Sequence, residues 1–470
     1  MDNRPTETRS DFVESRTFEE IAPGDSAVLR RSVVQQDIDL LAVLSGEAMP
    51  VSLAGTSSPG SAPGPLAASL VAVLLATELP GPGTVSLSQS LTFHGTVAAG
   101  DVLDLSLTVT ACDPGTRELE LACDLSTETG RKVASGTLRV RPPEKKVRRH
   151  RLELPDIRMS RHERFRALIA EAVCVTPPVV AVAHPCSAAA IAAAVEAAEA
   201  GIVTPILVGP RAKIALAAEE AGVMLDRFRL VDAPHSDAAA AEAVALVRRG
   251  EASLLMKGSL HTDELLRAVL ARDGGLRTER RLSHVYLMDV PSYPRPLLIT
   301  DAAVNIEPDL AIKRDIIRNA VDLARAMGID EPKVAILSAV ETVNPKLRST
   351  LDAAALCKMA DRGQITGALV EGPLAFDNAI NPQAAREKGI RSPVAGVADI
   401  LVVPDLEAGN ILAKQLTFLA GADAAGVVLG ARVPIILTSR ADAERTRLAS
   451  CAVAAKLARL AAAAYGKGTV

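Results

Sequence analysis

Hydrophobic and polar residues alternate along residues 85–140, as in the run VLDLSLTV at residues 102–109. Turn-forming residues at 113–115 and 129–130 separate the alternating runs, so the pattern predicts an antiparallel sheet. A single long apolar segment, about residues 65–79, comes before these strands and predicts one helix. A helix wrapped by a curved antiparallel sheet is an α+β arrangement, which we expect in the first part of the chain.

From residue 179 onward the pattern changes to short apolar strands followed by amphipathic helices. Residues 179–183 predict a strand, residues 188–200 a helix that ends at Gly201, and residues 205–208 the next strand. Further strands are expected at residues 254–256, 334–337, 368–370, 400–403 and 435–437. Repeated strand–helix units with buried strands predict a parallel α/β sheet. Because ligands of such sheets lie beyond the carboxyl ends of the strands, the polar residues that follow these strands are the candidates for chemistry.

A basic segment separates the two patterns. Residues 139–151 read RVRPPEKKVRRHR, with a proline pair and no apolar period. This composition is typical of a solvated tether, which we favour over a nucleic-acid patch. The expected organisation is therefore a first domain at residues 1–142, a basic linker at 143–158 and a second domain at 159–470.

The composition of the 470 residues supports large buried cores and disfavours several classes of protein. Hydrophobic residues make up 49% of the chain and charged residues 23%, which argues against bulk disorder. A net charge of −4, only 2% aromatic residues and the absence of Trp argue against nucleic acid as a partner. The six cysteines form no C-x-x-C pair, so neither a zinc site nor a disulfide framework is expected. The polar N-terminus lacks a signal-like segment and the apolar runs are too short for a bilayer, so we expect a cytoplasmic protein without a membrane partner.

The loop after residues 400–403 combines an acid, a glycine and two polar helical residues. Asp405 precedes a predicted helix, and Asn410 and Lys414 are four residues apart, on one helical face. Free N–H groups at a helix start can bind an anion, and Gly409 permits close approach of a ligand. An Asp N-cap followed by a solvated Lys is the alternative, and it requires no ligand.

Ser439 and Arg440 follow the last predicted strand and open the last predicted helix. Arginine holds phosphate bidentately and stays charged at any working pH. Ser439 and Asp442 also fit a capping box, which explains Asp442 without a function. The capping box does not explain Arg440, because the helix dipole disfavours a cation in the first turn.

Two further strand ends are candidates. Asp301 and Asn305 follow an apolar strand, and Lys257 lies in a Gly-containing strand-to-helix loop that could cradle an anion. Turn formation alone would also account for Asp301 and Asn305, and Thr262 could simply cap the helix that carries Arg267. The sequence lacks a Ser-His-Asp set, a metal cluster, a G-x-G-x-x-G fingerprint and a Walker loop. We therefore expect no metal and no cofactor, and a protein that supplies position and charge to bound substrates.

Four blocks of the second domain resemble the phosphate acetyltransferase and phosphate butyryltransferase family. They are TDAAVN (300–305), EGPLAFDNAI (371–380), ADILVVPDLEAGNILAK (398–414) and PIILTSRADA (434–443). The order and spacing of the four blocks argue against a chance resemblance. LMKG at 255–258 and SRAD at 439–442 resemble the butyryl type more than the acetyl type.

The resemblance implies an isocitrate/isopropylmalate dehydrogenase-like α/β/α fold, with two subdomains around a cleft. It implies the reversible reaction of a short-chain acyl-CoA with inorganic phosphate to give acyl phosphate and CoA, without metal or covalent enzyme intermediate. CoA would thus be a substrate, and the family suggests a homodimer or a higher homo-oligomer. By resemblance, the residues that would bind CoA or phosphate are Lys257, Arg267, Asp301, Asn305, Asp405, Asn410 and Lys414.

The same resemblance makes Ser439 and Arg440 the catalytic serine and arginine. In acetyl-type members a catalytic aspartate follows the serine by seven residues, where this chain has Thr446. Asp442 and Glu444 are the nearest acids, and we expect one of them to act as the base. Direct stabilisation of the CoA thiolate by Arg440 is the alternative.

The first domain resembles the MaoC-like hot-dog hydratases in three segments, residues 41–50, 79–93 and 97–103. In active hydratases the first segment continues as Gly-Asp-x-Asn-Pro-x-His, whose Asp and His activate water. Here the corresponding positions are Glu47, Met49 and Ser52, and Pro63 replaces a second characteristic His. A serine cannot act as imidazole does near pH 7, so we expect no hydration of enoyl-CoA. Binding of acyl-CoA or a role in dimerisation is expected instead.

Two other functions compete with an acyltransferase. The departures at Ser52 and Thr446 favour a catalytically weakened CoA-binding or scaffold protein. A metal-dependent dehydrogenase on the related fold would need aspartates clustered at metal-binding spacing, which the sequence does not contain.

Overall fold

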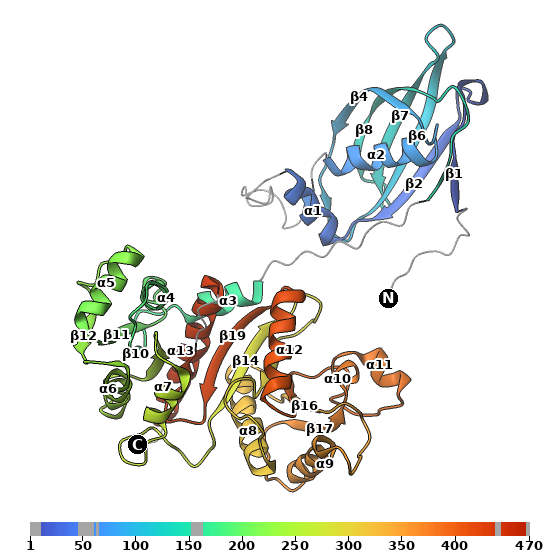
Figure 1. Cartoon of the computed structure of the whole chain (residues 1–470). Helices are drawn as coiled ribbons and strands as arrows, with labels where there is room; N and C mark the ends of the chain where they lie inside the picture. The colour runs from blue at the N-terminus through green and yellow to red at the C-terminus, as the bar shows by residue number, and fades with distance from the viewer. Residues whose placement is uncertain (1–10, 46–60, 63–64, 152–162, 438–442, 467–470) are drawn as a thin grey trace. The chain divides into compact units, whose positions relative to one another are not determined.

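The computed structural model describes residues 11–45, 61–62, 65–151, 163–437 and 443–466, and the chain divides into two compact units. The first unit is Met1–Met159 and the second is Ser160–Val470 (Figure 1). The four positions of the hydratase motif lie outside the described residues: Glu47, Met49, Ser52 and Pro63.

The first unit is an antiparallel sheet with a helix packed on it. Its elements are β1 (Phe12–Glu14), the 3-10 helix η1 (Phe18–Glu20), β2 (Ser26–Ser32), α1 (Gln35–Ser45), β3 (Ser61–Ala62), α2 (Pro65–Thr77), β4 (Val85–Phe93), β5 (Val97–Ala98), β6 (Val102–Asp113), β7 (Glu118–Thr127), β8 (Lys132–Arg141) and β9 (Arg148–His150). The main sheet has five strands in the order β2-β6-β7-β8-β4. Leu70 and Leu74 of α2 share a buried core with alternate residues of the strands, such as Leu105 and Leu121. The alternation in the sequence therefore follows the buried face, and the α+β hot-dog arrangement is confirmed (Figure 1).

Part of the segment expected to be a linker belongs to the first unit. Strand β9 pairs antiparallel with β1, with Val13 opposite Arg149. Next to this pair, the N–H of Val147 donates to Oγ of Ser15 (2.8 Å). Basic composition hides this pairing, because the main chain supplies the hydrogen bonds and the charged side chains stay exposed.

The second unit alternates strands and helices. Its elements are α3 (Glu163–Ala172), β10 (Val179–Ala183), α4 (Ala188–Glu199), β11 (Thr204–Gly209), α5 (Arg211–Ala221), β12 (Arg229–Asp232), α6 (Ser236–Arg248), β13 (Leu254–Lys257), α7 (Thr262–Val269), β14 (Ser283–Asp289), β15 (Leu297–Thr300), α8 (Leu310–Ala326), β16 (Lys333–Leu337), α9 (Arg348–Asp361), β17 (Leu369–Leu374), α10 (Phe376–Ile380), α11 (Pro382–Glu387), β18 (Ile400–Val402), α12 (Leu406–Leu419), β19 (Asp423–Leu429), β20 (Ile435–Ile436) and α13 (Glu444–Gly466). The α/β class is confirmed, and each strand expected from the sequence lies at or within two residues of its predicted start.

One 11-stranded sheet runs through the second unit in the order β12-β11-β10-β13-β20-β19-β14-β15-β18-β16-β17. In this order, neighbouring strands from β12 to β20 are parallel, and so are those from β15 to β17. The three pairs between them, β20–β19, β19–β14 and β14–β15, are antiparallel. The prediction of a parallel sheet is right within each half and wrong across the middle. Only residues 290–296 join β14 to β15, and only 430–434 join β19 to β20. A connection of this length is too short for the helical crossover that a parallel pair needs, so the strand that follows it runs antiparallel to the strand before it.

Helices cover both faces of this sheet (Figure 1). On one face, α3, α4, α5, α8, α9 and α13 share a single core cluster with the strands. On the other face the core is divided in two: an α6/α7 cluster, which includes Leu282 and Val428, and an α12 cluster, which includes Met288 and Ala424. Strand β19 contributes to both clusters, whereas β14 contributes Met288 to the α12 cluster and Leu282, just before β14, belongs to the α6/α7 cluster. The division between the clusters therefore falls at these two strands.

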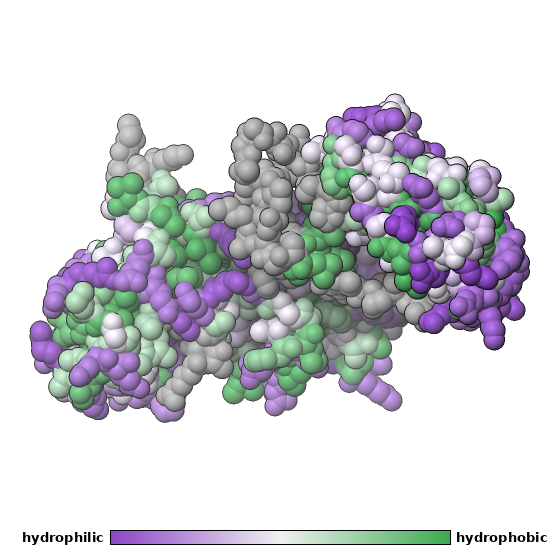
Figure 2. Space-filling model, turned by 90° about the horizontal axis from the view of Figure 1, so that it is seen from above, coloured by the Kyte–Doolittle hydropathy of each residue, from purple (hydrophilic) through white to green (hydrophobic). Residues whose placement is uncertain are grey.

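Exposed apolar side chains occur on both units. They include Val85 (54% exposed) and Phe93 (52%) on β4, and Phe418 (75%) and Leu419 (84%) on α12. Figure 2 shows hydrophilic and hydrophobic residues interspersed over the face it presents. Among the described helices, none is both long and apolar enough to cross a bilayer.

Candidate functional site

The carboxylate of Asp301 organises the loop after β15. Its Oδ1 accepts hydrogen bonds from the N–H groups of His284 (3.2 Å), Ala303 (3.0 Å) and Val304 (3.1 Å). Its Oδ2 accepts from the N–H (3.1 Å) and from Nδ2 (2.6 Å) of Asn305. Asp301 is only 2% exposed, so one buried carboxylate satisfies four main-chain donors and thereby shapes the loop.

The side chain of Asn305 belongs to the same network. Its Nδ2 also donates to the main-chain oxygen of Leu282 (2.8 Å), which ties the loop to the residue just before β14. Asp301 and Asn305 thus both have protein partners, as turn formation alone would require. A direct contact of either side chain with CoA or phosphate stays a prediction.

The start of α12 lies against this loop. Asp405 is the N-cap, and its Oδ1 accepts a main-chain N–H of the first turn (2.9 Å). A Cβ at Gly409 would lie 2.6 Å from the main-chain oxygen of Asp301, so glycine is needed for this packing. Nδ2 of Asn410 donates to the main-chain oxygen of Ala302 (3.3 Å). Three of the predicted site residues, Asp301, Asp405 and Asn410, are therefore brought together.

A second group of polar residues lies where β10 and β13 end. A Cβ at Gly258 would lie 2.4 Å from the last main-chain oxygen of β10, so the two loops pack main chain against main chain. The N–H of Ser259 donates to the main-chain oxygen of His184 (2.8 Å), and its Oγ donates to Oγ of Ser187 (2.7 Å). Lys257 ends β13 beside them, with Nζ 3.4 Å from the main-chain oxygen of Gly258. One cation, two hydroxyls and an imidazole thus gather at this strand end.

His184 and Ser187 are absent from the residues predicted from the sequence. The signal that could have found them is their position, because both immediately follow the buried strand at residues 179–183. Burial lowers the pKa of His184, and the nearby Lys213 lowers it further. The imidazole is therefore neutral near pH 7, as a hydrogen-bonding group rather than a cation.

Arg267 and Lys414 are exposed cations on helices. The guanidinium of Arg267 lies 3.5 Å from Asp237 and equally far from an acid one turn earlier, and its side chain is 67% exposed. Exposed pairs of this length contribute little, so the guanidinium can exchange them for an anionic ligand. Helix α7 is capped by His261, whose N–H donates to Glu264 (2.8 Å). The prediction that Thr262 caps this helix is therefore wrong, because Thr262 is already its first residue.

The expected catalytic centre adjoins described residues but lies outside them: Ser439, Arg440 and Asp442. Leu437, just before it, packs on the α6/α7 cluster. Glu444, just after it, is exposed and begins α13. In the first turn of this helix, the main-chain oxygen of Thr446 accepts a hydrogen bond from Oγ of Ser450 (2.8 Å). The roles of Asp442 and Glu444 stay predictions.

The two groups of polar residues end at opposite edges of the sheet. Three antiparallel steps separate β13 from β15 and β18, so β13 runs against both. The parallel sheet expected from the sequence would have placed all these polar residues at one edge, whereas the antiparallel middle strands divide them. Asp301, Asn305, Asp405 and Asn410 form one group, whereas Lys257 belongs to the other.

On the face that carries the α6/α7 and α12 clusters, His284 lies between Leu282, which belongs to the α6/α7 cluster, and Tyr286, which packs against the α12 cluster. Gly426 on β19 lies opposite Tyr286. The rings of His284 and Tyr286 meet edge to face, with centroids 4.4 Å apart. Burial lowers the pKa of His284 to about 4, and the Asp301 carboxylate opposes this shift only in part. His284 also was not among the residues predicted from the sequence, and no strand was expected at the position of β14.

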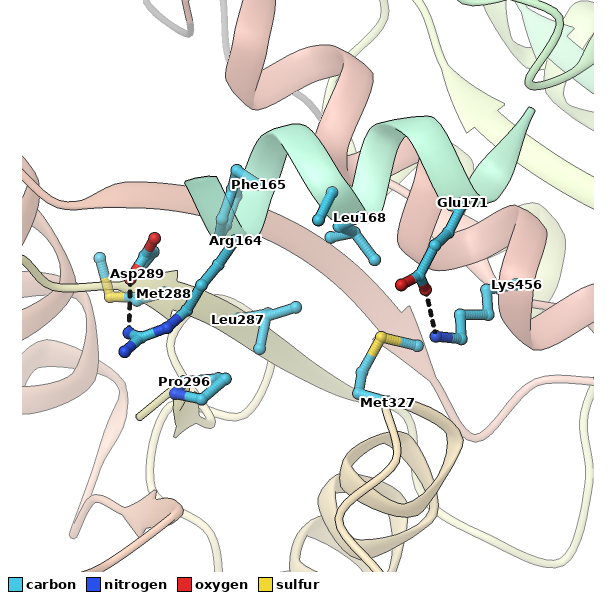
Figure 3. A pocket seen from close by; sticks show the side chains of 11 residues that line it. Arg164, Phe165, Leu168, Glu171, Leu287, Met288, Asp289, Pro296, Met327 and Lys456 are labelled. Atoms are coloured by element: carbon cyan, nitrogen blue, oxygen red, sulfur yellow. Dashed lines mark hydrogen bonds and ion pairs between the residues drawn. The ribbon is translucent and has the colours of Figure 1, made fainter. Parts of the chain in front are cut away.

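A separate cavity of about 230 Å³ lies between α3 and β14, on the face that carries the single core cluster. Leu168, Leu287 and Met327 are among its lining residues. Figure 3 shows that the charged side chains at its ends point to one another in pairs, Arg164 to Asp289 (2.7 Å) and Glu171 to Lys456 (3.1 Å). These mutual pairs make the cavity a poor phosphate site.

Comparison with known proteins agrees with the resemblance found in the loops. The family model described as phosphate acetyl/butaryl transferase matches residues 235–455. The phosphate acetyltransferase of Rhizobium meliloti is 66% identical over 292 residues, which cover 62% of this chain and 92% of that protein. The phosphate butyryltransferase of Clostridium acetobutylicum is 45% identical over 258 residues, covering 55% of this chain and 86% of the other. The LMKG and SRAD segments resemble the butyryl type, but the sequence identity is greater to this acetyltransferase (66%) than to this butyryltransferase (45%).

The fold of the second unit has a counterpart among solved structures. The crystal structure of a branched-chain phosphotransacylase from Enterococcus faecalis is 32% identical, with a TM-score of 0.54. The match covers 60% of this chain and 99% of that protein. The 66% identity along 92% of the Rhizobium meliloti protein, together with the sequence blocks, shows that the chain belongs to the phosphate acetyl/butyryl transferase family.

Proposed function

We propose that the second unit is a phosphate acyltransferase, which transfers a short acyl group reversibly between CoA and inorganic phosphate. The observation that carries this proposal is the 66% identity to a phosphate acetyltransferase along 92% of that protein. The rigid, glycine-dependent loops at the ends of β13, β15 and β18 support it, because they hold polar groups in fixed positions.

The reaction needs no oxidant or reductant. A phosphate oxygen forms a bond to the acyl carbon, and the carbonyl π electrons move to the carbonyl oxygen. When this oxyanion collapses, the carbon–sulfur bond breaks and its electron pair leaves with sulfur as a thiolate, which then takes up a proton. The protein must therefore hold a phosphate, donate hydrogen bonds to the oxyanion and stabilise the thiolate.

We assign these tasks as follows. Arg440 holds the phosphate and Ser439 donates to the reacting group. Asp442 or Glu444 exchanges the thiol proton. Cations outside this centre bind the anionic groups of CoA, with Lys257, Arg267 and Lys414 as the candidates.

A thiol-release assay tests the proposal. The purified chain is mixed with acetyl-, propionyl- or butyryl-CoA, and free thiol is followed with and without phosphate. The expected result is phosphate-dependent release that Arg440→Ala abolishes. Arg386→Ala is the matched control, because Arg386 is exposed on α11. If no acyl-CoA gives phosphate-dependent release, the chain is instead a weakened CoA-binding or scaffold protein.

The edge of the first unit supports assembly into a homodimer. β4 is the last strand of its sheet, and its nine residues, VSLSQSLTF, include no charge and no proline. Such an edge is a template for pairing with another strand. The sequence is self-complementary about Gln89. An antiparallel copy would place Val85 opposite Phe93, Ser86 opposite Thr92, Leu87 opposite Leu91, and Ser88 opposite Ser90.

The first unit would thus serve assembly or acyl-CoA binding rather than hydration. Loss of crotonyl-CoA absorbance in the presence of the chain would contradict this assignment. All six cysteines are free thiols, which fits the reducing conditions of the cytoplasm.

A further inference from the structure

His284 lies at a boundary in the core of the second unit. Side chains alternate along β14, so Val285 and Leu287 enter the single core cluster on one face. On the other face, Leu282 belongs to the α6/α7 cluster and Met288 to the α12 cluster. His284 stands between them, where neither apolar cluster is continuous.

The main chain ties His284 to the loop of the TDAAVN block. Its N–H donates to Oδ1 of Asp301 (3.2 Å), and its carbonyl oxygen accepts from Oγ1 of Thr300 (2.8 Å). A Cβ at Gly426 would lie 2.8 Å from Nε2 of the imidazole, so glycine at this position makes room for the ring. The ring position is thus determined by β14, by β19 and by the Asp301 loop together.

The imidazole has an unmet hydrogen-bonding atom. His284 is 1% exposed, and its Nδ1 is buried without a hydrogen-bond partner among the described residues. Leaving such an atom unpaired costs about 1–3 kcal/mol. Unpaired buried polar atoms are uncommon in folded proteins, and a bound ligand is one way to satisfy them.

The charge around the ring indicates which part of a substrate it would meet. Among the described residues, the Asp301 carboxylate is the charged group that acts on the ring, and burial keeps the imidazole neutral near pH 7. A phosphate dianion would be repelled by this carboxylate, and it would find no cation on His284. An acyl carbonyl is uncharged in the ground state, and it accepts the single hydrogen bond that a neutral imidazole donates.

We propose that the imidazole of His284 donates a hydrogen bond to the acyl carbonyl oxygen of the bound substrate and to the oxyanion formed from it. This inference rests on the proposed acyltransferase function and adds a donor that the family resemblance did not supply. The carbonyl π electrons that move to oxygen as phosphate attacks are stabilised by a donor that is already in place.

Four substitutions test the proposal. His284→Asn and His284→Gln place an amide N–H near the positions of Nδ1 and Nε2, and His284→Leu removes the donor. Met288→Leu, at a buried position on the same face of β14, is the control for repacking the strand. Each variant is assayed for phosphate-dependent thiol release from acetyl-CoA, with kcat and KM determined separately. Circular dichroism checks that each variant is folded.

The expected result is a fall in kcat of about 10²–10³-fold in His284→Leu, the loss typical of one oxyanion donor. KM should change little, one of the two amide variants should recover at least part of the rate, and Met288→Leu should stay near the unaltered chain. Equal losses in the leucine and both amide variants would overturn the proposal, as would full activity of folded His284→Leu.

Nuclear magnetic resonance of the unaltered chain with 15N-labelled histidine gives an answer even if the variants fail to fold. Burial lowers the pKa of both His184 and His284, so the signals of His284 are assigned as the neutral-ring pair that persists in His184→Gln. The proposal expects acetyl-CoA to move this pair, and it is wrong if acetyl-CoA leaves the pair unmoved. If the unaltered chain releases no thiol from acetyl-CoA with phosphate, the proposed function fails and this inference fails with it. If the unaltered chain is active and the His284 substitutions do not change its rate, only this inference is contradicted.

Discussion

Replacing Asp301 by asparagine should destabilise the second unit far more than the removal of one charge from a surface would. In the unaltered chain Oδ2 accepts two hydrogen bonds, from the N–H and from Nδ2 of Asn305. An asparagine that keeps its oxygen at the Oδ1 position would put an NH₂ group at the Oδ2 position. The two N–H donors of this NH₂ group would then face the N–H and Nδ2 donors of Asn305. Water cannot easily relieve this clash, because residue 301 is only 2% exposed.

The magnitude follows from the hydrogen bonds that are lost. Hydrogen bonds to a charged group contribute about 1.5–3 kcal/mol each, so the loss of two costs about 3–6 kcal/mol. At about 2 °C per kcal/mol for a unit of this size, the calorimetric transition of the second unit should fall by roughly 6–12 °C. The transition of the first unit should not move.

The matched control is Asp309→Asn. Asp309 is the exposed N-cap of α8, and its Oδ1 accepts the N–H of Ile312 (2.8 Å). Asparagine caps helices as well as aspartate does, so this variant should stay within about 0.5 kcal/mol of the unaltered chain. If Asp301→Asn shifts the transition no more than the control does, then the Asp301 network does not hold the loop, and the argument from its hydrogen bonds is wrong.

Three further predictions concern the pH dependence of stability, the dimer edge and a buried ion pair. An unfolded histidine has a pKa near 6.5 and buried His284 a pKa of about 4, so between these pH values the unfolded state binds a proton that the folded state does not. As pH falls from 6.5 to 4, the unaltered chain should therefore lose up to about 3 kcal/mol of stability relative to His284→Gln. Above about pH 6.5 the difference should not change, and urea midpoints measure it. Oxidation of Gln89→Cys should give a covalent dimer on non-reducing gels, because Gln89 would face its own copy in the partner strand. Val85→Cys is the control and should not cross-link, because Val85 would face Phe93 of the partner strand. Equal cross-linking of the two variants would exclude strand pairing about a two-fold axis at Gln89. Nζ of Lys313 lies 2.8 Å from Oδ2 of Asp352 with both residues buried, so Asp352→Leu should cost about 3–5 kcal/mol and adding Lys313→Met should restore most of it, measured as urea midpoints. A double variant no more stable than Asp352→Leu would contradict the cost of an unpaired buried lysine.

Local patterns in the sequence were sufficient for the fold class, the family and many of the elements, but they did not predict β9, β12, β14 or β19. Alternation predicted the sheet of the first unit, because a period of two can bury only one face. Buried apolar runs of four or five residues predicted the strands of the second unit, such as β10 and β13. Strand-end blocks predicted the chemistry, because they combine residue types with an order along the chain.

The direction of the middle strands and the neighbours of each polar residue depend on tertiary structure. The run of strand residues in β14 reads the same in a parallel and an antiparallel sheet, and only the short loop at 290–296 hints at its reversal. That reversal separates Lys257 from Asp301, which a parallel sheet would have placed at one edge. It also determines where β14 passes between the two apolar clusters.

What the sequence determined by itself is the fold class, the strands and helices with a clear apolar period, and the family that the loops resemble, since all of these depend on neighbours along the chain. What only the tertiary structure decided is the task of each polar side chain. Asp301 and Asn305 look like substrate ligands in the sequence, yet their oxygen and nitrogen atoms bind the loop itself. His284 was not singled out from the sequence, yet folding leaves its Nδ1 buried and unpaired among the described residues. The physical reason is that hydrogen bonding is decided by partners within about 3 Å, and most of those partners come from distant parts of the chain.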